Sequence, residues 1–379
     1  MINIEVMFWF CIVFIFYSYI GYPILLYLWS LLHPVEINKK EINKYPDVSV
    51  VIAAHNEADN IKQRIENIIL QDYPKKNLEI IIVSDGSNDN TNNIVEELMN
   101  KPDVILRLLF HNPAKGKPFS INQGVSASNG EIIVFTDCRQ RFSSDAIRHL
   151  VNNFNDDKVG CVSGELVFKN TLGSPIQGEM GAYWNFEKWL RKLESKTGAV
   201  PGATGSIYAI RKNLFKTIPE KTLIDDVLIP LNISMQGYRV IFDSQAVAFD
   251  SVSKDLEQEK RRKIRTLAGN WQLFFLQPNL FNPLKNPLWI KFLSHKIFRL
   301  LIPYTLFILI GTTILSQNPL SYIILAGIAL FFIIAVIPPL SGHLIIISRL
   351  SSICRSIILL NYFALLAPIK LILTPKTLW

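Results

Sequence analysis

Long apolar runs at the two ends of the chain enclose a middle part in which apolar and polar positions are mixed. No charged residue occurs from position 7 to position 32, and apolar residues predominate again after position 300. Because an α-helix rises 1.5 Å per residue, about 20 apolar residues cross a hydrocarbon core of about 30 Å. The first run therefore predicts an amino-terminal membrane span.

A cleaved signal peptide is the alternative explanation of this first run. Its apolar region would have about 7–15 residues and would end at a small-residue cleavage site. The run here is longer, ends in Trp29 and Leu31, and lacks such a site. We therefore expect a permanent anchor.

The carboxy-terminal part predicts two or three further spans, at 300–316, 320–340 and 357–373. The last of these is interrupted by Asn361, Pro368 and Lys370. It either crosses the membrane with Lys370 snorkelling to the surface, or lies in the interface.

Basic residues next to the apolar runs predict the side of the membrane on which the middle part of the chain lies. Only Glu5 precedes the first span, whereas the residues that follow it include Lys39, Lys40 and Lys44. The next apolar run is also preceded by basic residues, at Lys291, Lys296 and Arg299. Since cytoplasmic loops carry the excess of lysine and arginine, we expect a multi-pass protein of the cell (inner or plasma) membrane, with its middle part in the cytoplasm.

The middle part predicts alternating strands and helices. Buried β-branched runs, expected as strands, occur at 48–54, 78–83, 104–110 and 131–136. Helical spacing of apolar residues occurs between them, at 61–69, 91–99 and 119–127. This alternation predicts an α/β, Rossmann-like domain with a mostly parallel sheet and helices on both faces.

Acidic residues follow three of the predicted strands. Glu57, Asp85 and Asp137 come directly after the first, second and fourth strands. Such residues often cap the following helix. Three carboxylates at one sheet edge repel one another, however, unless a cation or ligand joins them, and ligands of parallel sheets bind at that edge. We therefore expect a binding site there.

Composition adds little to this picture. The net charge of +8 suits a protein that lies on anionic lipid. Nucleic acid would also suit this charge, but the basic residues are not interleaved with aromatic ones in a recognisable module, so we expect no nucleic-acid partner. The four cysteines show no metal-ligand spacing and, in a reducing compartment, no disulfide framework is expected.

Several motifs in chain order resemble the family 2 glycosyltransferases with a GT-A fold. They are the strand and loop 48–57, Ser84-Asp-Gly-Ser-Asn-Asp89, Lys115-Gly-Lys117 with Asn122, Thr136-Asp137, Leu223-Ile-Asp-Asp226 and the stretch 262–272. With its flanking spans the chain is similar to the membrane-integrated branch that contains cellulose, hyaluronan and poly-N-acetylglucosamine synthases. The resemblance implies an amino-terminal helix at 1–35, a GT-A domain at 40–280, an interfacial segment at 281–299 and a transmembrane region at 300–379.

The resemblance implies a nucleotide-sugar donor and assigns residues to it. Carboxylates at strand ends accept hydrogen bonds from the base or ribose, a glycine permits close backbone approach, and cations suit the diphosphate. The donor residues are then Ala54, Asn56, Glu57, Asp85, Gly86, Lys115, Lys117, Arg262 and Arg265. The alternatives are a tight turn at Gly86, a solvated basic turn at the two lysines, and an amphipathic helix on anionic lipid for the basic run 260–265.

The same resemblance assigns the catalytic and metal residues. Asp226 matches the general base that takes the proton of the acceptor hydroxyl, and Asp225 is its acidic neighbour. The alternative is a charge pair at a helix start. Asp137 would bind Mg²⁺ or Mn²⁺ that bridges the diphosphate. The family's Asp-x-Asp is here Asp137-Cys138-Arg139, and Arg139 cannot bind a metal; it either pairs with phosphate or points away.

The acceptor site departs from the family as well. A loop of small residues would admit the acceptor sugar, or serve only as a structural turn, at Gly202, Ala203, Thr204 and Gly205. The Gln-x-x-Arg-Trp motif of processive synthases keeps only its arginine, and Trp271 is the available substitute for stacking on the acceptor. An aromatic cluster could line the acceptor channel or rest at the membrane interface, at Trp184, Phe186 and Trp189.

These features predict an inverting transfer from a UDP-sugar to a glycan in cell-surface polysaccharide synthesis. One alternative is single addition to a lipid acceptor of the polyprenyl-phosphate type, which the missing Gln and Trp favour. Another is a non-catalytic membrane scaffold, against which the intact Asp226 argues. Since few spans are present, a channel would need an oligomer or a partner subunit.

Overall fold

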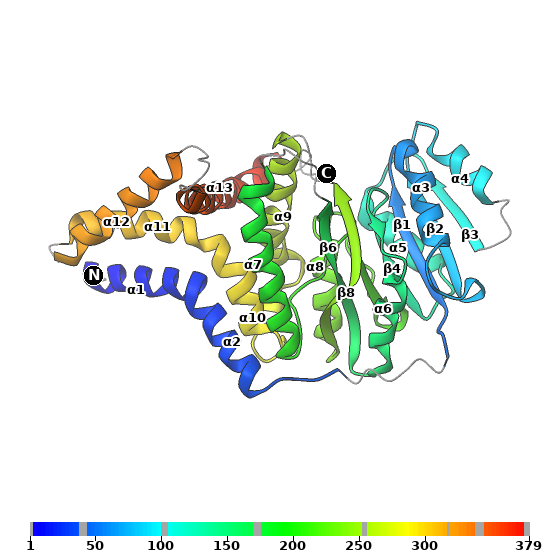
Figure 1. The fold of residues 1–379 in the computed structure, drawn as a ribbon, viewed down its shortest axis with the longest axis horizontal. Helices are drawn as coiled ribbons and strands as arrows, with labels where there is room; N and C mark the ends of the chain where they lie inside the picture. The colour runs from blue at the N-terminus through cyan, green and yellow to red at the C-terminus, as the bar shows by residue number, and fades with distance from the viewer. Residues whose placement is uncertain are drawn as a thin grey trace.

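The computed structural model describes residues 3–37, 44–99, 105–169, 176–251, 256–316, 319–337 and 345–374. Figure 1 shows an elongated molecule with apolar helices at one end and an α/β domain at the other. Lys39 and Lys40, used above for the orientation, lie outside the described residues, as does the end of the predicted span 320–340.

The α/β domain contains an eight-stranded sheet of order β3-β2-β1-β4-β7-β6-β8-β5. The strands are β1 (Val48–Ala54), β2 (Leu78–Asp85), β3 (Ile105–His111), β4 (Ile132–Phe135), β5 (Arg141–Phe142), β6 (Val159–Lys169), β7 (Tyr208–Arg211) and β8 (Arg239–Ser251). Pairings among β1, β2, β3 and β4 are parallel, as is that of β6 with β8, while β7 runs antiparallel to both its neighbours. The predicted fold class, a mostly parallel α/β sheet, is confirmed.

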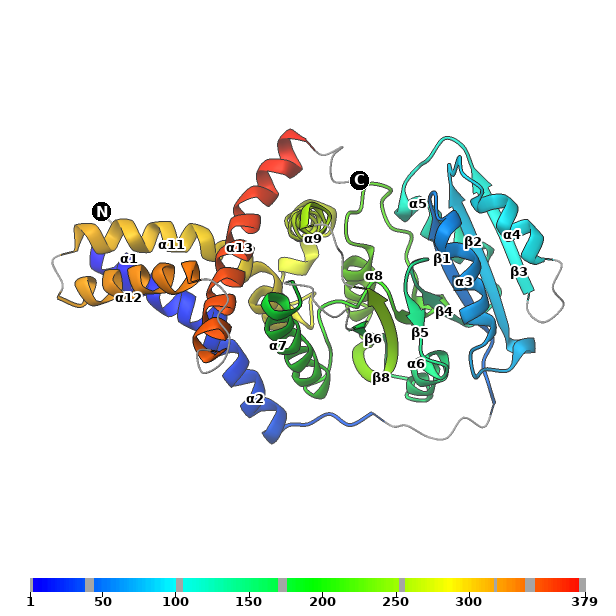
Figure 2. The same cartoon turned by 45° about the horizontal axis from the view of Figure 1, so that its top comes forward.

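Helices cover both faces of the sheet, and two of them border its carboxyl edge. They are α3 (Ala58–Ile69), α4 (Thr91–Met99), α5 (Lys117–Ala127), α6 (Ala146–Asn152), α7 (Ile176–Lys196), α8 (Asp225–Ser234) and α9 (Leu256–Leu276). Figure 2 shows α7 and α9 between the sheet and the apolar helices. They therefore connect the two halves of the molecule.

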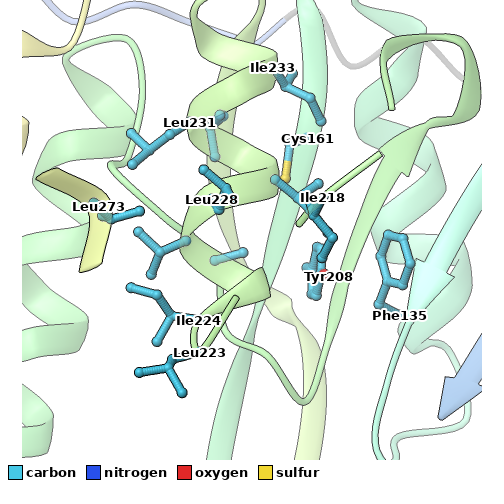
Figure 3. Close-up of a cluster of buried hydrophobic side chains, with 14 of the residues drawn as sticks. Phe135, Cys161, Tyr208, Ile218, Leu223, Ile224, Leu228, Leu231, Ile233 and Leu273 are labelled. Carbon is cyan, nitrogen blue, oxygen red and sulfur yellow. The ribbon is translucent and has the colours of Figure 1, made fainter. Parts of the chain in front are cut away.

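The side chains of β1 pack on both faces of the sheet, because successive residues of a strand point to opposite sides. Ile52 and the β1 residues on the same face of the strand belong to one buried cluster with α3 residues such as Ile65. Val51 belongs to a second cluster with Ile121 of α5. This second cluster continues through α8 and α9 (Figure 3). It also includes Leu300, so the core of the α/β domain is continuous with the first carboxy-terminal apolar helix.

Four helical segments of the described chain are long and apolar enough to cross a membrane. They are Ile4–Leu32, Trp289–Leu315, Pro319–Val336 and Leu350–Leu373. The first comprises α1 (Ile4–Phe16), a π-turn (Tyr17–Gly21) and α2 (Tyr22–Leu32); the others contain α10 (Trp289–Phe292), a π-turn (Leu293–Ile297), α11 (Phe298–Leu315), α12 (Pro319–Val336) and the larger part of α13 (Ile345–Leu373).

Two of these segments differ from the spans that the sequence predicted. The second begins at Trp289, before the apolar run that starts at Leu300, because the π-turn carries Lys296 and His295 inside a continuous helix. Helix α13 continues through Asn361 and Pro368. The Asn361 amide is satisfied within the protein, since Nδ2 donates to Ile357 O at 2.8 Å and to Tyr19 Oη at 2.9 Å.

A buried polar network joins the amino-terminal anchor, α7 and the π-turn of the second segment. Tyr22 Oη donates to Glu194 Oε1 at 2.6 Å, and His295 Nδ1 lies 2.7 Å from the same oxygen. The other ring nitrogen of His295 lies 3.0 Å from Glu187 Oε2, and Arg299 pairs with the same carboxylate. Because breaking a buried pair leaves an uncompensated charge, this network holds α7 in a fixed position against the apolar helices.

Candidate active site

A cleft of about 900 Å³ opens at the carboxyl edge of the sheet. Its walls come from the ends of β1, β4 and β6, the first turn of α8, and the facing sides of α7 and α9. A cleft of this size suits a ligand as large as a nucleotide sugar. The side chains that line the cleft determine what it can bind.

Three carboxylates and one ammonium group meet in the cleft. Lys117, the first residue of α5, donates from Nζ to Asp137 Oδ1 at 2.9 Å and lies 3.7 Å from Asp225 Oδ1. Asp225 and Asp226 begin α8, so their side chains project from the helix start into the same space. The side chain of Asp137 is 42% exposed and that of Asp225 only 8%, so Asp137 faces the open part of the cleft.

The pKa of Asp226 and the pKa of Asp137 are shifted in opposite directions. Burial raises the pKa of Asp226, and Asp225 raises it further, against the opposing charge of Lys117. Burial also acts to raise the pKa of Asp137, but Lys117 outweighs it and the pKa falls below the ordinary value. Asp226 is thus the better proton acceptor, and Asp137 stays ionised.

Two arginines of α9 face these carboxylates from the opposite wall. Within the described part of the chain, neither Arg262 nor Arg265 has a carboxylate at salt-bridge distance. Burial lowers the pKa of Arg262, and the positive charges of Arg139 and Arg265 act in the same direction. This cluster of cations without direct partners favours an anion in the cleft.

Arg139 lines the cleft and forms an ion pair with a carboxylate of β8. Its Nη2 pairs with Asp250 Oδ2, to which Gln140 Nε2 also donates at 2.8 Å. The Asp250 side chain is only 2% exposed. The sequence left two alternatives for Arg139, pairing with phosphate or pointing away. In the structure Arg139 instead pairs with a buried carboxylate.

The predicted donor residues fall into two groups. Glu57, Lys117, Arg262 and Arg265 line the cleft. Asp85 instead organises the neighbouring loop: Oδ1 accepts from Lys115 N at 2.7 Å and Oδ2 from Gly116 N at 2.8 Å.

Asn56, Gly86 and Lys115 lie in the loops beside this cleft rather than among its lining residues. Gly86 has φ +62°, and a Cβ there would lie 2.6 Å from Ala114 N, so no other residue fits. The side chain of Ala54 is buried in the core, whereas Ala53 lines the cleft. The Ala54 side chain does not reach the cleft, because alternate residues of a strand face opposite sides, and its assignment to the donor stays a prediction.

The loop of small residues lies against Asp226. Ala203, Thr204 and Gly205 line the cleft, and Ala203 N donates to Asp226 O at 2.7 Å. Gly202, at φ +140°, is outside the lining and supplies the turn. The loop thus fixes the start of α8 and leaves room beside the carboxylate of Asp226.

Substituting Gly205 by alanine is expected to lower kcat by about tenfold or more, since a misplacement of about 1 Å can cost about 10²-fold. The new Cβ would lie 2.8 Å from Asp226 Oδ2 and would displace that carboxylate. The measurement is nucleotide release under saturating donor, with thermal unfolding to check folding. Gly311→Ala is the matched control, because its Cβ would meet nothing within 4 Å. Equal rates for the two variants would contradict the expectation.

Trp271 does not line the cleft, which corrects its assignment as an acceptor-stacking residue. Its ring packs against Phe274 at 5.5 Å and Tyr304 at 6.4 Å between centroids. The next residue contacts the loop before α8 instead: Gln272 Oε1 accepts from Leu223 N at 2.9 Å and Nε2 donates to Lys221 O at 2.6 Å. Because successive residues of α9 point in different directions, Gln272 positions the loop that leads into α8.

The aromatic cluster on α7 divides between cleft and membrane anchor. Trp184 lines the cleft next to Phe168, with ring centroids 5.6 Å apart. Trp189 lies on another side of the helix, against Tyr27 of α2 at 6.5 Å. Trp184 thus lies on the cleft side of α7 and Trp189 on the side of α2, and the acceptor channel and the membrane interface both stay predictions.

Arg191 of α7 lines the cleft and was not among the predicted site residues, and Lys188 lines the cleft as well. With Trp184 they recur at positions i, i+4 and i+7, which is one face of a helix. This spacing could have indicated them in the sequence, but only the fold shows that the face is turned to the cleft.

The fold and this cleft define a GT-A-like α/β domain joined to long apolar helices. Residues 49–218 match the family model "Glycosyl transferase family 2". This segment of the chain therefore resembles that family.

Two bacterial proteins are among those similar to this chain. The probable glycosyltransferase YdaM of Bacillus subtilis (strain 168) is 28% identical over 242 residues, which cover 61% of this chain and 57% of the relative. Poly-beta-1,6-N-acetyl-D-glucosamine synthase of Staphylococcus aureus (strain MSSA476) is 26% identical over 266 residues, covering 66% and 63%. The match thus spans less than two thirds of each of these relatives.

A solved structure shares the fold over nearly the whole chain. It is the mannosyltransferase PcManGT from Pyrobaculum calidifontis, in complex with GDP-Man and Mn²⁺. It has a TM-score of 0.70 at 23% identity, covering 96% of this chain and 99% of that one. At this identity the likeness concerns the fold.

Proposed function

We propose that the protein transfers a sugar, with inversion, from a UDP-sugar to a hydroxyl of a glycan acceptor, in the synthesis of a cell-surface polysaccharide. The observation that carries the proposal is the meeting of Asp137, Asp225, Asp226 and Lys117 in one cleft. Opposite them lie two arginines that have no carboxylate at salt-bridge distance among the residues described by the structure. A second supporting point is the similarity to a poly-beta-1,6-N-acetyl-D-glucosamine synthase.

Asp226 is the proposed general base. The acceptor hydroxyl oxygen attacks the anomeric carbon of the donor, its proton passes to the carboxylate of Asp226, and the bond from that carbon to the diphosphate oxygen breaks. Gly205 leaves room for the acceptor next to this carboxylate. Burial suits the role, because it raises the pKa of Asp226 and makes the carboxylate a stronger base.

Lys117, Arg262 and Arg265 are the proposed partners of the leaving diphosphate. Negative charge grows on the diphosphate as the bond breaks, and fixed cations in a partly buried cleft stabilise it. Lys117 can exchange its contact with Asp137 for a phosphate oxygen without losing its ionised form. Its pKa is raised above the ordinary value: burial acts to lower it, but the charge of Asp137 outweighs burial.

A divalent cation fits this cleft through Asp137. The carboxylate is partly exposed, only its Oδ1 is engaged by Lys117, and phosphate oxygens of the donor would complete the oxygen ligands of Mg²⁺ or Mn²⁺. Among the residues that the structure describes, no group of three metal-binding side chains occurs. When bound, the metal would add positive charge at the leaving diphosphate.

The rate is expected to fall as the pH is lowered through the raised pKa of Asp226. A base must be ionised, so activity is present above this pKa and is lost below it, at a pH above the ordinary Asp value of about 3.9. Asp225→Asn removes a charge that raises this pKa, so the acid limb of kcat/KM should move to lower pH. The pH profiles of nucleotide release from both proteins measure this, and a limb that stays or moves upward would contradict it.

A panel of nucleotide sugars tests the proposed function. Purified full-length protein in nanodiscs receives each donor with Mg²⁺ or Mn²⁺ and a native membrane extract as the source of acceptor. We expect release of UDP with one sugar, and a product whose mass increases by that sugar. Folded protein that releases no nucleotide with any donor would contradict the proposal.

Single addition to a lipid-linked acceptor is a second candidate, favoured by the packing of Trp271 away from the cleft. Stacking of the acceptor sugar by a tryptophan is part of the processive pattern that the chain resembles. The length of the product separates the candidates, since a processive enzyme yields long chains at low turnover, whereas single addition yields one sugar per acceptor.

A further inference from the structure

A hydrogen bond from Arg191 connects α7 to the loop of small residues beside the proposed base. Arg191 Nη1 donates to Thr204 Oγ1 at 2.8 Å, and both residues line the cleft. A hydrogen bond from an ionised guanidinium is about twice as strong as one between neutral groups. Thr204 is buried, so the contact is largely shielded from water. The loop is therefore held firmly against α7 at this point.

Two other residues of α7 that line the cleft contact β6 instead. Trp184 Nε1 donates to Leu166 O at 3.2 Å, and Lys188 Nζ lies 2.9 Å from Glu165 Oε1. These two contacts hold α7 against the sheet. Arg191 differs from them, because its contact fixes the loop rather than a strand.

The same loop is also held by the sheet. Ser163 Oγ accepts from Thr204 N at 2.9 Å and lies 3.2 Å from Thr204 Oγ1. Ser163 belongs to β6 and is fully buried. Thr204 is thus fixed by side chains of two elements, β6 and α7. Because Ser163 remains when Arg191 is removed, we expect the loop to shift and the domain to stay folded.

The position of this loop determines that of Asp226. Ala203 N, one residue before Thr204, donates to Asp226 O at 2.7 Å. Gly205, one residue after Thr204, borders the carboxylate so closely that a Cβ there would lie 2.8 Å from Asp226 Oδ2. The residues on both sides of Thr204 therefore adjoin the proposed base, and a shift of Thr204 displaces it.

Helix α7 is a fixed support for Arg191. Glu187 and Glu194, one turn before and one turn after Arg191, both lie at ion-pair distance from His295. Glu187 also pairs with Arg299. Because these contacts join α7 to the second apolar segment, the helix keeps its position, and Arg191 can hold the loop in place.

We propose that Arg191 is a positioning residue of the transfer reaction. Through Thr204 it holds the loop of small residues, and with it Asp226, where the carboxylate takes the proton of the acceptor hydroxyl. This inference rests on the proposed function, in which Asp226 is the base. In this role Arg191 touches no reacting atom, so its loss should lower kcat and leave donor binding intact.

Arg191→Met tests the role in full-length protein in nanodiscs, with native membrane extract as the source of acceptor. Methionine has a long side chain and donates no hydrogen bond. We expect kcat of nucleotide release to fall about 10- to 100-fold, since a misplacement of about 1 Å can cost about 10²-fold. The donor KM and the melting temperature should change little. Thr204→Val should cause a similar fall, whereas Thr204→Ser keeps the hydroxyl and should retain most of the rate.

A double substitution shows whether Arg191 acts through Thr204. Arg191→Met combined with Thr204→Val should be no slower than the slower single variant, because both remove the same hydrogen bond. Effects that multiply would overturn the inference, as would a raised donor KM with unchanged kcat, which would make Arg191 a donor contact. Lys192→Met is the control, since this side chain of α7 is 49% exposed and lies outside the cleft, and it should behave like the wild type.

Amide hydrogen exchange separates failure of this inference from failure of the proposed function, because it requires no turnover. We expect faster exchange of residues 202–206 in Arg191→Met, with unchanged exchange in β1 and β2. Unchanged exchange of the loop would overturn the inference whether or not the protein releases nucleotide, and so would wild-type kinetics in this variant. A folded wild-type protein that releases no nucleotide would contradict the proposed function instead.

Discussion

Replacing Asp226 by asparagine is expected to lower kcat of sugar transfer by about 10²–10⁴-fold, the usual contribution of a positioned general base. Asparagine keeps the size of the side chain and cannot take the acceptor proton. The donor KM should change little, because the proposed diphosphate partners, Lys117, Arg262 and Arg265, remain in place. Nucleotide release and product mass, measured together, report both quantities.

Asp157→Asn is the control for this substitution, because the Asp157 side chain is fully exposed and touches Arg211 only at 4.0 Å. It should behave like the wild type. Retained transfer by the Asp226 variant, with an unchanged melting temperature, would exclude Asp226 as the base and would reopen the possibility of a scaffold without catalysis.

Lys117→Met is expected to lower kcat by about 10²–10³-fold, as for the loss of one preorganised donor to a developing negative charge. The substitution also leaves Asp137, Asp225 and Asp226 without their shared cation, so donor binding should weaken. The acid limb of the pH profile should move upward, since Lys117 acts to lower the pKa of Asp226. Initial rates at several donor concentrations and pH values measure all three effects.

Lys117→Arg and Lys62→Met complete this experiment. The arginine variant keeps the charge and should retain more activity than the methionine variant. Lys62 is an exposed residue of α3 outside the cleft, so its loss should have no effect. Wild-type kinetics in Lys117→Met would contradict the proposed role in leaving-group stabilisation.

The sequence alone predicted the fold because its local signals agree with the tertiary structure. Strand β1 was predicted with its observed bounds, since its seven residues carry no charge; all of them pair with β2, and the first four also pair with β4. The acidic residues after β1, β2 and β4 lie near one edge because those strands are parallel neighbours. Asp225 and Asp226 begin α8, where the following apolar residues had placed them.

Other features depend on contacts between distant residues. Trp271 and Gln272 are adjacent in sequence, yet only Gln272 reaches the loop before α8, because the rotation of α9 is set by packing. Arg139 is engaged by Asp250 of β8, a strand that the motif does not include. Arg191 reaches the cleft because α7 is held by the buried network of Glu187, Glu194 and His295.

This network gives the membrane helices a role in the site itself. Tyr22 of the first apolar segment contacts Glu194, and Lys296 of the second lies near enough to Asp226 for their charges to interact. The proposed acceptor side of the cleft is therefore built at the junction of both halves of the molecule.

A structure of the full-length protein bound to the nucleoside diphosphate that it releases, with Mn²⁺, tests the central claim most directly. The account predicts diphosphate oxygens at hydrogen-bond distance from Lys117 and from Arg262 or Arg265, with Asp226 facing the space where the sugar was attached. A nucleotide bound outside this cleft, or a diphosphate turned away from these cations, would contradict it.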